Sequence, residues 1–173
     1  MEHIVIGKGV TVIGNDAFYD HTSVISVDLP DGLKEIHGYA FGGCGSLKTI
    51  KIPGSVISIA DSVFDDCGSL DSISVDPDNS NYTSSDGVLY DKDMSTIIRY
   101  PAGKTADLFT IPGTVVTIGD SSFERCHNLI SVEIPEGVKT IDEYAFYGCD
   151  IFHSVSIPGS VEEICYSAFE ACT

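Results

Sequence analysis

The sequence predicts a β-rich solenoid of about six 23-residue coils, built from short parallel strands and single 3₁₀ or helical turns and interrupted by a β-hairpin insert. Two observations predict this fold class. Five of the six cysteines stand three residues after a phenylalanine, and within each half of the chain these Phe-x-x-Cys marks recur every 23 residues. A proline stands eleven residues before most of these phenylalanines, as Pro53 does before Phe64. A strict period of this length is typical of stacked repeats.

The common pattern of the repeat is I-x-I-P-x-x-V-x-x-I-x-x-x-A-F-x-x-C-x-x-L-x-x. Aligned on this pattern, the chain is predicted to form one solenoid domain over residues 1–173. Its repeats are 4–26, 27–49, 50–72, 109–131, 132–154 and 155–173, and the insert is 73–108.

Each copy predicts the same elements in the same order. Ile50 and Ile52 alternate with polar residues, which indicates a short strand with one buried face, and Pro53 ends it because proline has no N–H to donate. Val56 and Ile59 then fill the interior from the return segment. The A-F-x-x-C stretch has the spacing of one helical or 3₁₀ turn with Phe and Cys pointing inward. A single coil cannot bury its apolar face until neighbouring coils stack on it.

The insert opens with turn-forming residues at 76–81 and then carries two apolar stretches, 88–90 and 97–100. This order predicts a β-hairpin that projects from the solenoid or covers it. Three of the eight tyrosines lie here: Tyr82, Tyr90 and Tyr100. In a chain without tryptophan they are candidates for a contact patch, because aromatic side chains with a polar tip anchor interfaces. The alternative is that they cover the insert's own small core.

The charge balance excludes some partners. The chain has 26 acidic residues against 9 basic ones, a net charge of −17, whereas nucleic-acid binding needs clustered Lys and Arg. The acids are expected on outward turns around a nearly uncharged interior. No apolar run is long enough to span a bilayer, so we expect no membrane insertion. The start, Met1–Ile4, shows no secretion signal.

The cysteines predict a buried column, since one thiol per coil recurs at a fixed register. Such thiols pack as small apolar groups and donate weakly to loop carbonyls. Disulfides Cys44–Cys67 and Cys126–Cys149 are the alternative, because stacked coils lie about 4.8 Å apart. Cys165 falls outside the column at a variable position, so we expect it to be the most reactive thiol.

We expect no catalytic residues, no metal and no cofactor. The chain has neither a C-x-x-C zinc spacing nor a G-x-S-x-G nucleophile turn, and paired acids such as Asp65-Asp66 are expected at the solvated surface. The run 76–80 superficially resembles a calcium loop. It lacks the glycine at the sixth position, which is Asn81, and the glutamate at the twelfth, which is Gly87. An enzyme is therefore a distant alternative.

The residues that flank the buried pair of each strand should face outward and form a polar strip. Together with the three insert tyrosines, these strip residues are the candidates for ligand binding. The strip residues are Ser26, Asp28, Thr49, Lys51, Ser72, Ser74, Thr110, Ser131, Glu133, Ser154 and Ser156. Such small polar side chains suit a broad, wet contact with a protein, and they suit plain solvation equally well.

The repeat closely resembles the BspA-type leucine-rich repeats, a family of mainly bacterial cell-surface proteins. The segments that carry the resemblance are 154–161, SVSIPGSV, and 142–149, DEYAFYGC, and the resemblance covers nearly the whole chain. The insert, with 86–93 followed by 98–104, is similar to a hairpin insert of that family. The resemblance implies adhesion or recognition at the cell surface, or secretion, and no enzymatic activity.

The expected function is therefore non-enzymatic recognition of a host or matrix protein at the cell surface. The alternative is a structural spacer or stalk within a larger surface protein whose binding is carried elsewhere. Solenoids need capping repeats, and both end coils lack one in the sequence. We therefore expect either a piece of a longer protein or end-to-end self-association through the uncapped repeats.

Overall fold

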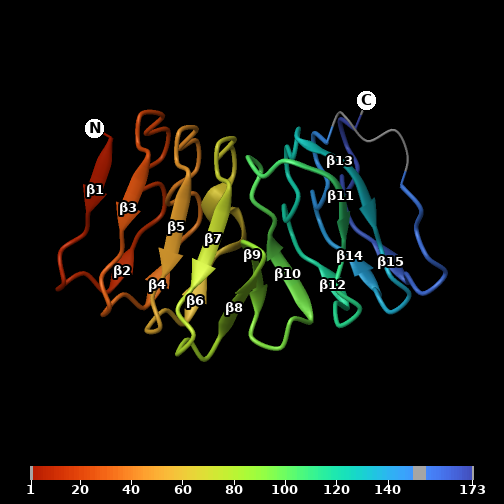
Figure 1. The fold of residues 1–173 in the computed structure, drawn as a ribbon, viewed down its shortest axis with the longest axis horizontal. Coiled ribbons are helices and arrows are strands. Elements are labelled where there is room, and N and C mark those ends of the chain that lie inside the picture. Colours follow the sequence, from red (N-terminus) through yellow and green to blue (C-terminus); the bar gives the residue numbers. More distant parts are fainter. Residues whose placement is uncertain (1, 150–154, 173) are drawn as a thin grey trace.

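The computed structural model of the chain describes residues 2–149 and 155–172. The chain winds into a β-solenoid of about seven turns, which confirms the predicted fold class. The coils lie side by side along the long axis of the molecule, with the two termini at opposite ends (Figure 1). Strand pairs from coil to coil are offset by 23 residues, as in His3 with Ser26 and Ser26 with Thr49, so the sequence period is the period of the stack.

The predicted I-x-I strands form the front sheet, which is in two parts. The four-stranded part contains β1 (His3–Val5), β3 (Ser26–Asp28), β5 (Thr49–Ile52) and β7 (Ser72–Val75), all parallel. The two-stranded part contains β11 (Ala106–Thr110) and β13 (Leu129–Glu133). Ile50 and Ile73 are almost fully buried on the inner face, as the alternation predicted.

The return segment of each coil forms a second, two-residue strand that was not predicted. These strands are β2 (Val12–Ile13), β4 (Glu35–Ile36), β6 (Ser58–Ile59), β12 (Thr117–Ile118), β14 (Thr140–Ile141) and β15 (Glu163–Ile164). Two residues are too few to show an alternation in the sequence. Their isoleucines still fill the interior, since Ile36, Ile118 and Ile141 are completely buried.

The described A-F-x-x-C corners are tight turns closed from the cysteine N–H to the phenylalanine carbonyl, as in Cys67 N to Phe64 O at 3.3 Å, but most of them lack the predicted helical form. Within the described ranges, a 3₁₀ helix, η1, forms only at Asp61–Phe64. Elsewhere the residues two before and two after the phenylalanine have positive φ, for example Tyr144 at 52°. A left-handed residue on either side of the phenylalanine interrupts helical hydrogen bonding, so the chain turns sharply. The phenylalanine rings stack from coil to coil, with Phe123 and Phe146 4.9 Å apart at 18°.

Part of the segment predicted as an insert belongs to the solenoid itself. After β7, a strand that was not predicted, β8 (Tyr82–Ser85), pairs antiparallel with β9 (Val88–Asp91). The hairpin predicted from 88–90 and 97–100 is formed by β9 and the strand that follows it. Strand β10 (Thr96–Arg99) then pairs antiparallel with β9 and parallel with β12, so it occupies a return-strand position. Tyr100 follows β10 at the corner position of the phenylalanines and stacks on Phe123 at 5.2 Å. Segment 73–108 is therefore a coil with a hairpin built into it (Figure 1).

Two apolar clusters fill the solenoid, and this coil contributes residues to both, such as Leu89 to the first and Tyr90 to the second. Contrary to expectation, charged groups are buried between them. Arg99 is 1% exposed, and the carboxyl groups of Asp65 and Glu124, each 8% exposed, lie beside it. Asp65 was expected at the solvated surface. It is buried because its carboxylate accepts a hydrogen bond from Arg99 and closes the gap between the two halves.

Candidate functional site

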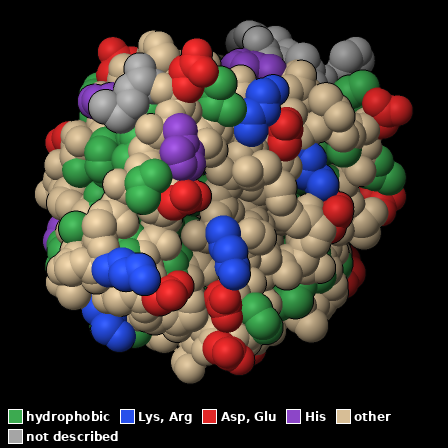
Figure 2. Space-filling view, turned by 60° about the vertical axis from the view of Figure 1, so that its left-hand side comes forward, with side chains coloured by type: hydrophobic (Ala, Val, Ile, Leu, Met, Phe, Trp, Pro, Cys, Tyr) green, Lys and Arg blue, Asp and Glu red, His purple; other side chains and the backbone are tan. Residues whose placement is uncertain are grey.

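The predicted strip lies on the outer face of the front sheet. Among its described members, seven are exposed: Asp28, Thr49, Lys51, Ser74, Thr110, Glu133 and Ser156. Three are half-buried: Ser26, Ser72 and Ser131. Ser154 lies outside the described residues. The side of the molecule that carries the first coils shows acidic, basic, histidine and hydrophobic side chains scattered over the surface (Figure 2).

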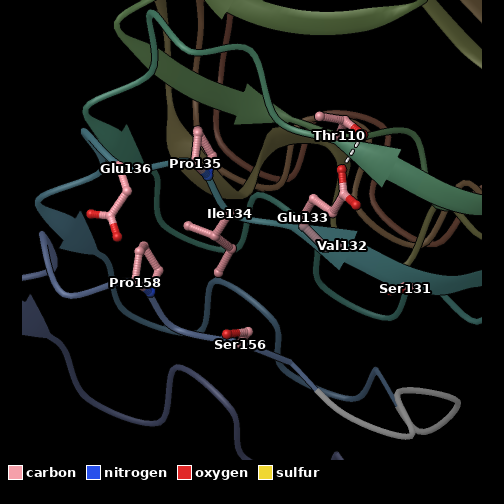
Figure 3. A pocket seen from close by; sticks show the side chains of 9 residues that line it. All are labelled: Thr110, Ser131, Val132, Glu133, Ile134, Pro135, Glu136, Ser156 and Pro158. Atoms are coloured by element: carbon pink, nitrogen blue, oxygen red, sulfur yellow. Dashed lines mark hydrogen bonds between the residues drawn. The ribbon is translucent and has the colours of Figure 1, made fainter.

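A hollow of about 560 Å³ lies on the second part of the strip. Four predicted strip residues line it, Thr110, Ser131, Glu133 and Ser156, together with the apolar side chains of Val132, Ile134, Pro135 and Pro158 and the carboxylate of Glu136. Glu133 turns toward Thr110, whose Oγ1 donates a hydrogen bond to Glu133 Oε2 at 2.8 Å (Figure 3). The hollow thus combines hydroxyls, carboxylates and an apolar lining, which suits contact with a peptide surface.

On the first part of the strip, ionisable side chains pair between neighbouring coils. Lys51 Nζ lies 3.1 Å from a carboxylate oxygen of Asp76, and His3 Nε2 lies 3.3 Å from Asp28 Oδ2. The backbone N–H of Asp78 and the Lys51 ammonium lower the pKa of Asp76 below its ordinary value. The Lys51–Asp76 pair lies at the surface, where ion pairs contribute little to stability.

The hairpin divides the strip into its two parts. Gly87, in the β8–β9 turn with φ of 78°, accepts a hydrogen bond from Ile73 N at 2.8 Å. A Cβ at Gly87 would lie only 2.8 Å from Ser72 Oγ, so glycine allows the turn to close over β7. The predicted continuous strip is therefore two separate surfaces.

The contact patch predicted for the insert tyrosines is wrong for two of them. Tyr90 is 1% exposed and Tyr100 is completely buried, so neither can meet a partner. Tyr82 is half-buried, and its hydroxyl accepts a hydrogen bond from Ile59 N at 2.9 Å. The alternative interpretation holds, because these rings fill the coil that carries the hairpin and join it to β6.

The cysteine column is stabilised by hydrogen bonds between coils. Cys67 Sγ donates to Phe41 O at 3.1 Å, and Cys149 Sγ donates to Phe123 O at 3.0 Å. Cys44, Cys67 and Cys126 are free thiols, so neither of the two alternative disulfides is present. Burial raises the pKa of Cys67 to about 12. These thiols are structural groups with little thiolate character.

Cys165 is the half-buried thiol outside the column. Desolvation and the carboxylates of Glu163 and Asp142 raise its pKa, which lowers the fraction of reactive thiolate. Its accessibility favours reaction, and its electrostatic surroundings oppose it.

The described residues hold no group of three His, Cys, Asp or Glu side chains placed to bind a metal ion. The run considered as a calcium loop is a structural turn. Asn79, 1% exposed, donates hydrogen bonds from its side-chain amide to the carbonyls of Pro53 and Val56 in the preceding coil. In the part of the chain that the structure describes, no helix is both long and apolar enough to cross a membrane.

A family model of the BspA type leucine-rich repeat region matches residues 1–107 and 99–173, with six copies. The chain belongs to this family. BspA-type repeat proteins have a fold that typically carries no enzymatic activity. No curated protein matches the chain.

Solved structures of other leucine-rich repeat proteins share this fold. One from Eubacterium ventriosum is 32% identical, with a TM-score of 0.87, over 100% of this chain and 52% of that one. A leucine-rich cell surface protein from Faecalibacterium prausnitzii is 27% identical, with a TM-score of 0.70, over 99% of this chain and 57% of that one. The pneumococcal vaccine antigen PcpA, 22% identical with a TM-score of 0.82 over 95% and 47%, shows likeness of fold alone. The BspA-type chain described here spans about half the length of these proteins.

The other five tyrosines were not among the residues predicted from the sequence to bind a ligand. All lie within three residues of a corner phenylalanine: Tyr19, Tyr39, Tyr144, Tyr147 and Tyr166. Each is exposed or half-buried. Their closeness to the corner phenylalanines, at one residue after or two to three residues before, was the signal that could have found them.

Proposed function

We propose that this chain is a non-enzymatic recognition module that binds a host or matrix protein at the bacterial cell surface through its front sheet. The observation that supports this most directly is the hollow lined by Thr110, Ser131, Glu133 and Ser156, where polar strip residues surround an apolar lining. A solved relative named as a cell surface protein supports the location.

The test fills the hollow without touching the core. Ser131→Trp places a large side chain in it, and Ser80→Trp places the same side chain on an exposed turn of the insert. Both variants are compared with the parent chain for binding to immobilised fibronectin, laminin and collagen by surface plasmon resonance. Binding that Ser131→Trp abolishes and Ser80→Trp leaves intact supports the proposal. Binding that survives Ser131→Trp contradicts it.

The second candidate is a structural spacer that stacks on further coils. The first coil favours it, because Val5 is 69% exposed and Val12 is 44% exposed on two strands that each pair on one side only. An open strand edge with apolar side chains suits another coil or a second copy of the chain. Val5→Lys should lower end-to-end association in light scattering. An equal association constant for the parent and the variant would contradict this surface.

A further inference from the structure

A groove of about 350 Å³ runs along the corner edge of the solenoid, apart from the front sheet. It is lined by Tyr39, Asp65, Ser121, Glu124, Tyr144, Tyr147, Tyr166 and Glu170. These residues come from coils on both sides of the coil that carries the hairpin. The buried groups Asp65, Ser121 and Glu124 form the floor, and the exposed or half-buried tyrosines form the walls.

The tyrosine rings at one end of the groove stand at right angles to each other. Tyr144 lies 5.6 Å from Tyr166 at 83° and 5.9 Å from Tyr147 at 82°, between ring centroids. Ring faces turned in different directions around one space can surround a cation, because each face carries a partial negative charge.

Backbone stability does not account for tyrosine at these places. Tyr39 and Tyr144 have φ of 55° and 52°, a conformation that bulky residues rarely adopt. The same corner position holds small polar residues in other coils, such as Asp16 and Ser121. The two large aromatic side chains therefore occupy strained positions at the groove although smaller residues satisfy the turn.

The floor of the groove has an excess of negative charge. Two carboxyl groups, Asp65 and Glu124, lie beside the guanidinium of Arg99. A second guanidinium, that of Arg125, lies 3.8 Å from Glu124 Oε1 and also pairs with Asp66, so three carboxyl groups meet two guanidinium groups. Glu124 is 8% exposed, and its Oε2 accepts no hydrogen bond from the described residues, although Arg99 Nη2 lies 3.5 Å away. Above about pH 7, where Glu124 is ionised, a buried carboxylate oxygen without a donor is costly, and a donor entering the groove would remove that cost. Glu170 adds an exposed carboxylate at the rim.

The chain already places a cation on one of these rings. The guanidinium carbon of Arg125 lies 6.0 Å from the centroid of Tyr147, and the same side chain pairs with Asp66. The ring face is thus suited to cation contact in this protein. The other side chains of the groove leave room for a second cation.

We propose that this groove binds the ammonium or guanidinium group of a lysine- or arginine-containing peptide segment of a partner protein. The carboxylates exclude an anionic ligand. The net charge of −17 attracts basic segments over a distance, and the tyrosine walls select among them by direct contact. This surface is separate from the front sheet, so the proposal stands or falls independently of the proposed function.

The test uses fluorescein-labelled hexalysine, with hexaglutamate and an uncharged Ser-Gly hexapeptide for comparison, and measures binding by fluorescence anisotropy. The salt concentration is about 0.15 M, at which charges more than about 8 Å apart are largely screened. Tyr166, 67% exposed, is changed to Leu or to Phe. Tyr166→Leu should weaken hexalysine binding about threefold to tenfold, and Tyr166→Phe should keep it because the ring face remains.

A charge-matched pair separates the groove from general attraction. Glu170→Gln and Glu133→Gln change the net charge equally, but only Glu170 lines the groove. The proposal requires that Glu170→Gln weakens binding more than Glu133→Gln does. Three results would overturn it: no saturable binding of hexalysine, equal binding by the parent and Tyr166→Leu, or equal losses for the two glutamine variants. Thermal unfolding of each variant checks that the fold is kept.

Discussion

Arg99 Nη1 donates a hydrogen bond to Asp65 Oδ1 at 2.9 Å, and this contact joins the two halves of the solenoid. The same guanidinium donates to Phe64 O at 2.9 Å and to Ser121 O at 2.7 Å. In other coils the carbonyl at the position of Phe64 accepts a hydrogen bond from a thiol of the next coil, as Phe41 O does from Cys67 Sγ. The coil with the hairpin has Gly103 at the cysteine position, so Arg99 supplies the missing donors.

We predict that Arg99→Met destabilises the fold strongly. The change removes a buried cation and leaves Asp65 and Glu124 without their partner, a kind of loss that typically costs about 3–5 kcal/mol. The free energy of unfolding from urea titration measures it. Arg125→Met is the matched control, because Arg125 pairs with Asp66 at the surface, where the expected loss is about 1 kcal/mol or less. Equal losses in the two variants would contradict the bridging role of Arg99.

Stability should also depend on pH through Glu124. Burial and the neighbouring carboxylate of Asp65 raise the pKa of Glu124 from 4.5 to about 7. The folded state therefore holds the proton more tightly than the unfolded state does. This contribution to stability is complete below about pH 4.5, is lost as the pH rises to about 7, and stays constant above that.

Glu124→Gln isolates this effect, because glutamine keeps the shape and does not titrate. The difference in unfolding free energy between the variant and the parent, measured from pH 4 to 8, should shift in favour of the variant as the pH rises. A difference that is flat across this range would show that Glu124 has an ordinary pKa.

The sequence period predicted the coils, the front strands and the cysteine column because each depends on contacts between equivalent residues of neighbouring coils. Each residue lies next to the residue 23 positions away in the sequence, as Thr49 lies next to Ser72. The outward direction of the strip followed from the same alternation. The corners were mispredicted because their conformation depends on φ at residues such as Tyr144, and a spacing of apolar residues does not reveal φ.

The buried charges could not be predicted because they depend on where the period fails. Arg99 and Glu124 lie 25 residues apart in sequence, and Asp65 lies in another coil on the far side of Arg99. Only the position of β10, which pairs with β12 at an offset of 21 instead of 23, brings them together. The same displaced coil buries Tyr90 and Tyr100, which is why their predicted exposure was wrong.

Tyr100 provides a test of its place in the aromatic stack. Its ring takes the position of a corner phenylalanine, and its hydroxyl has no hydrogen-bond partner within the described structure. Tyr100→Phe should therefore keep stability or raise it by about 1 kcal/mol, whereas Tyr100→Ala should cost about 3–5 kcal/mol. Urea unfolding measures both. A clear loss in Tyr100→Phe would mean that the hydroxyl is hydrogen-bonded in solution.

The last prediction concerns the thiols. Cys44, Cys67, Cys126 and Cys149 are buried, whereas Cys165 is half-buried outside the column. A thiol reagent such as DTNB should label Cys165 in the native protein and reach the buried four only on unfolding. Its labelling should accelerate as the pH rises, because its pKa is raised by desolvation and by neighbouring carboxylates. Cys172 is half-buried as well, so Cys165→Ser should lower native-state labelling by one thiol and leave that of Cys172, whereas Cys67→Ser should leave native-state labelling unchanged. Rapid native labelling that survives Cys165→Ser in full would show that the column opens in the folded state.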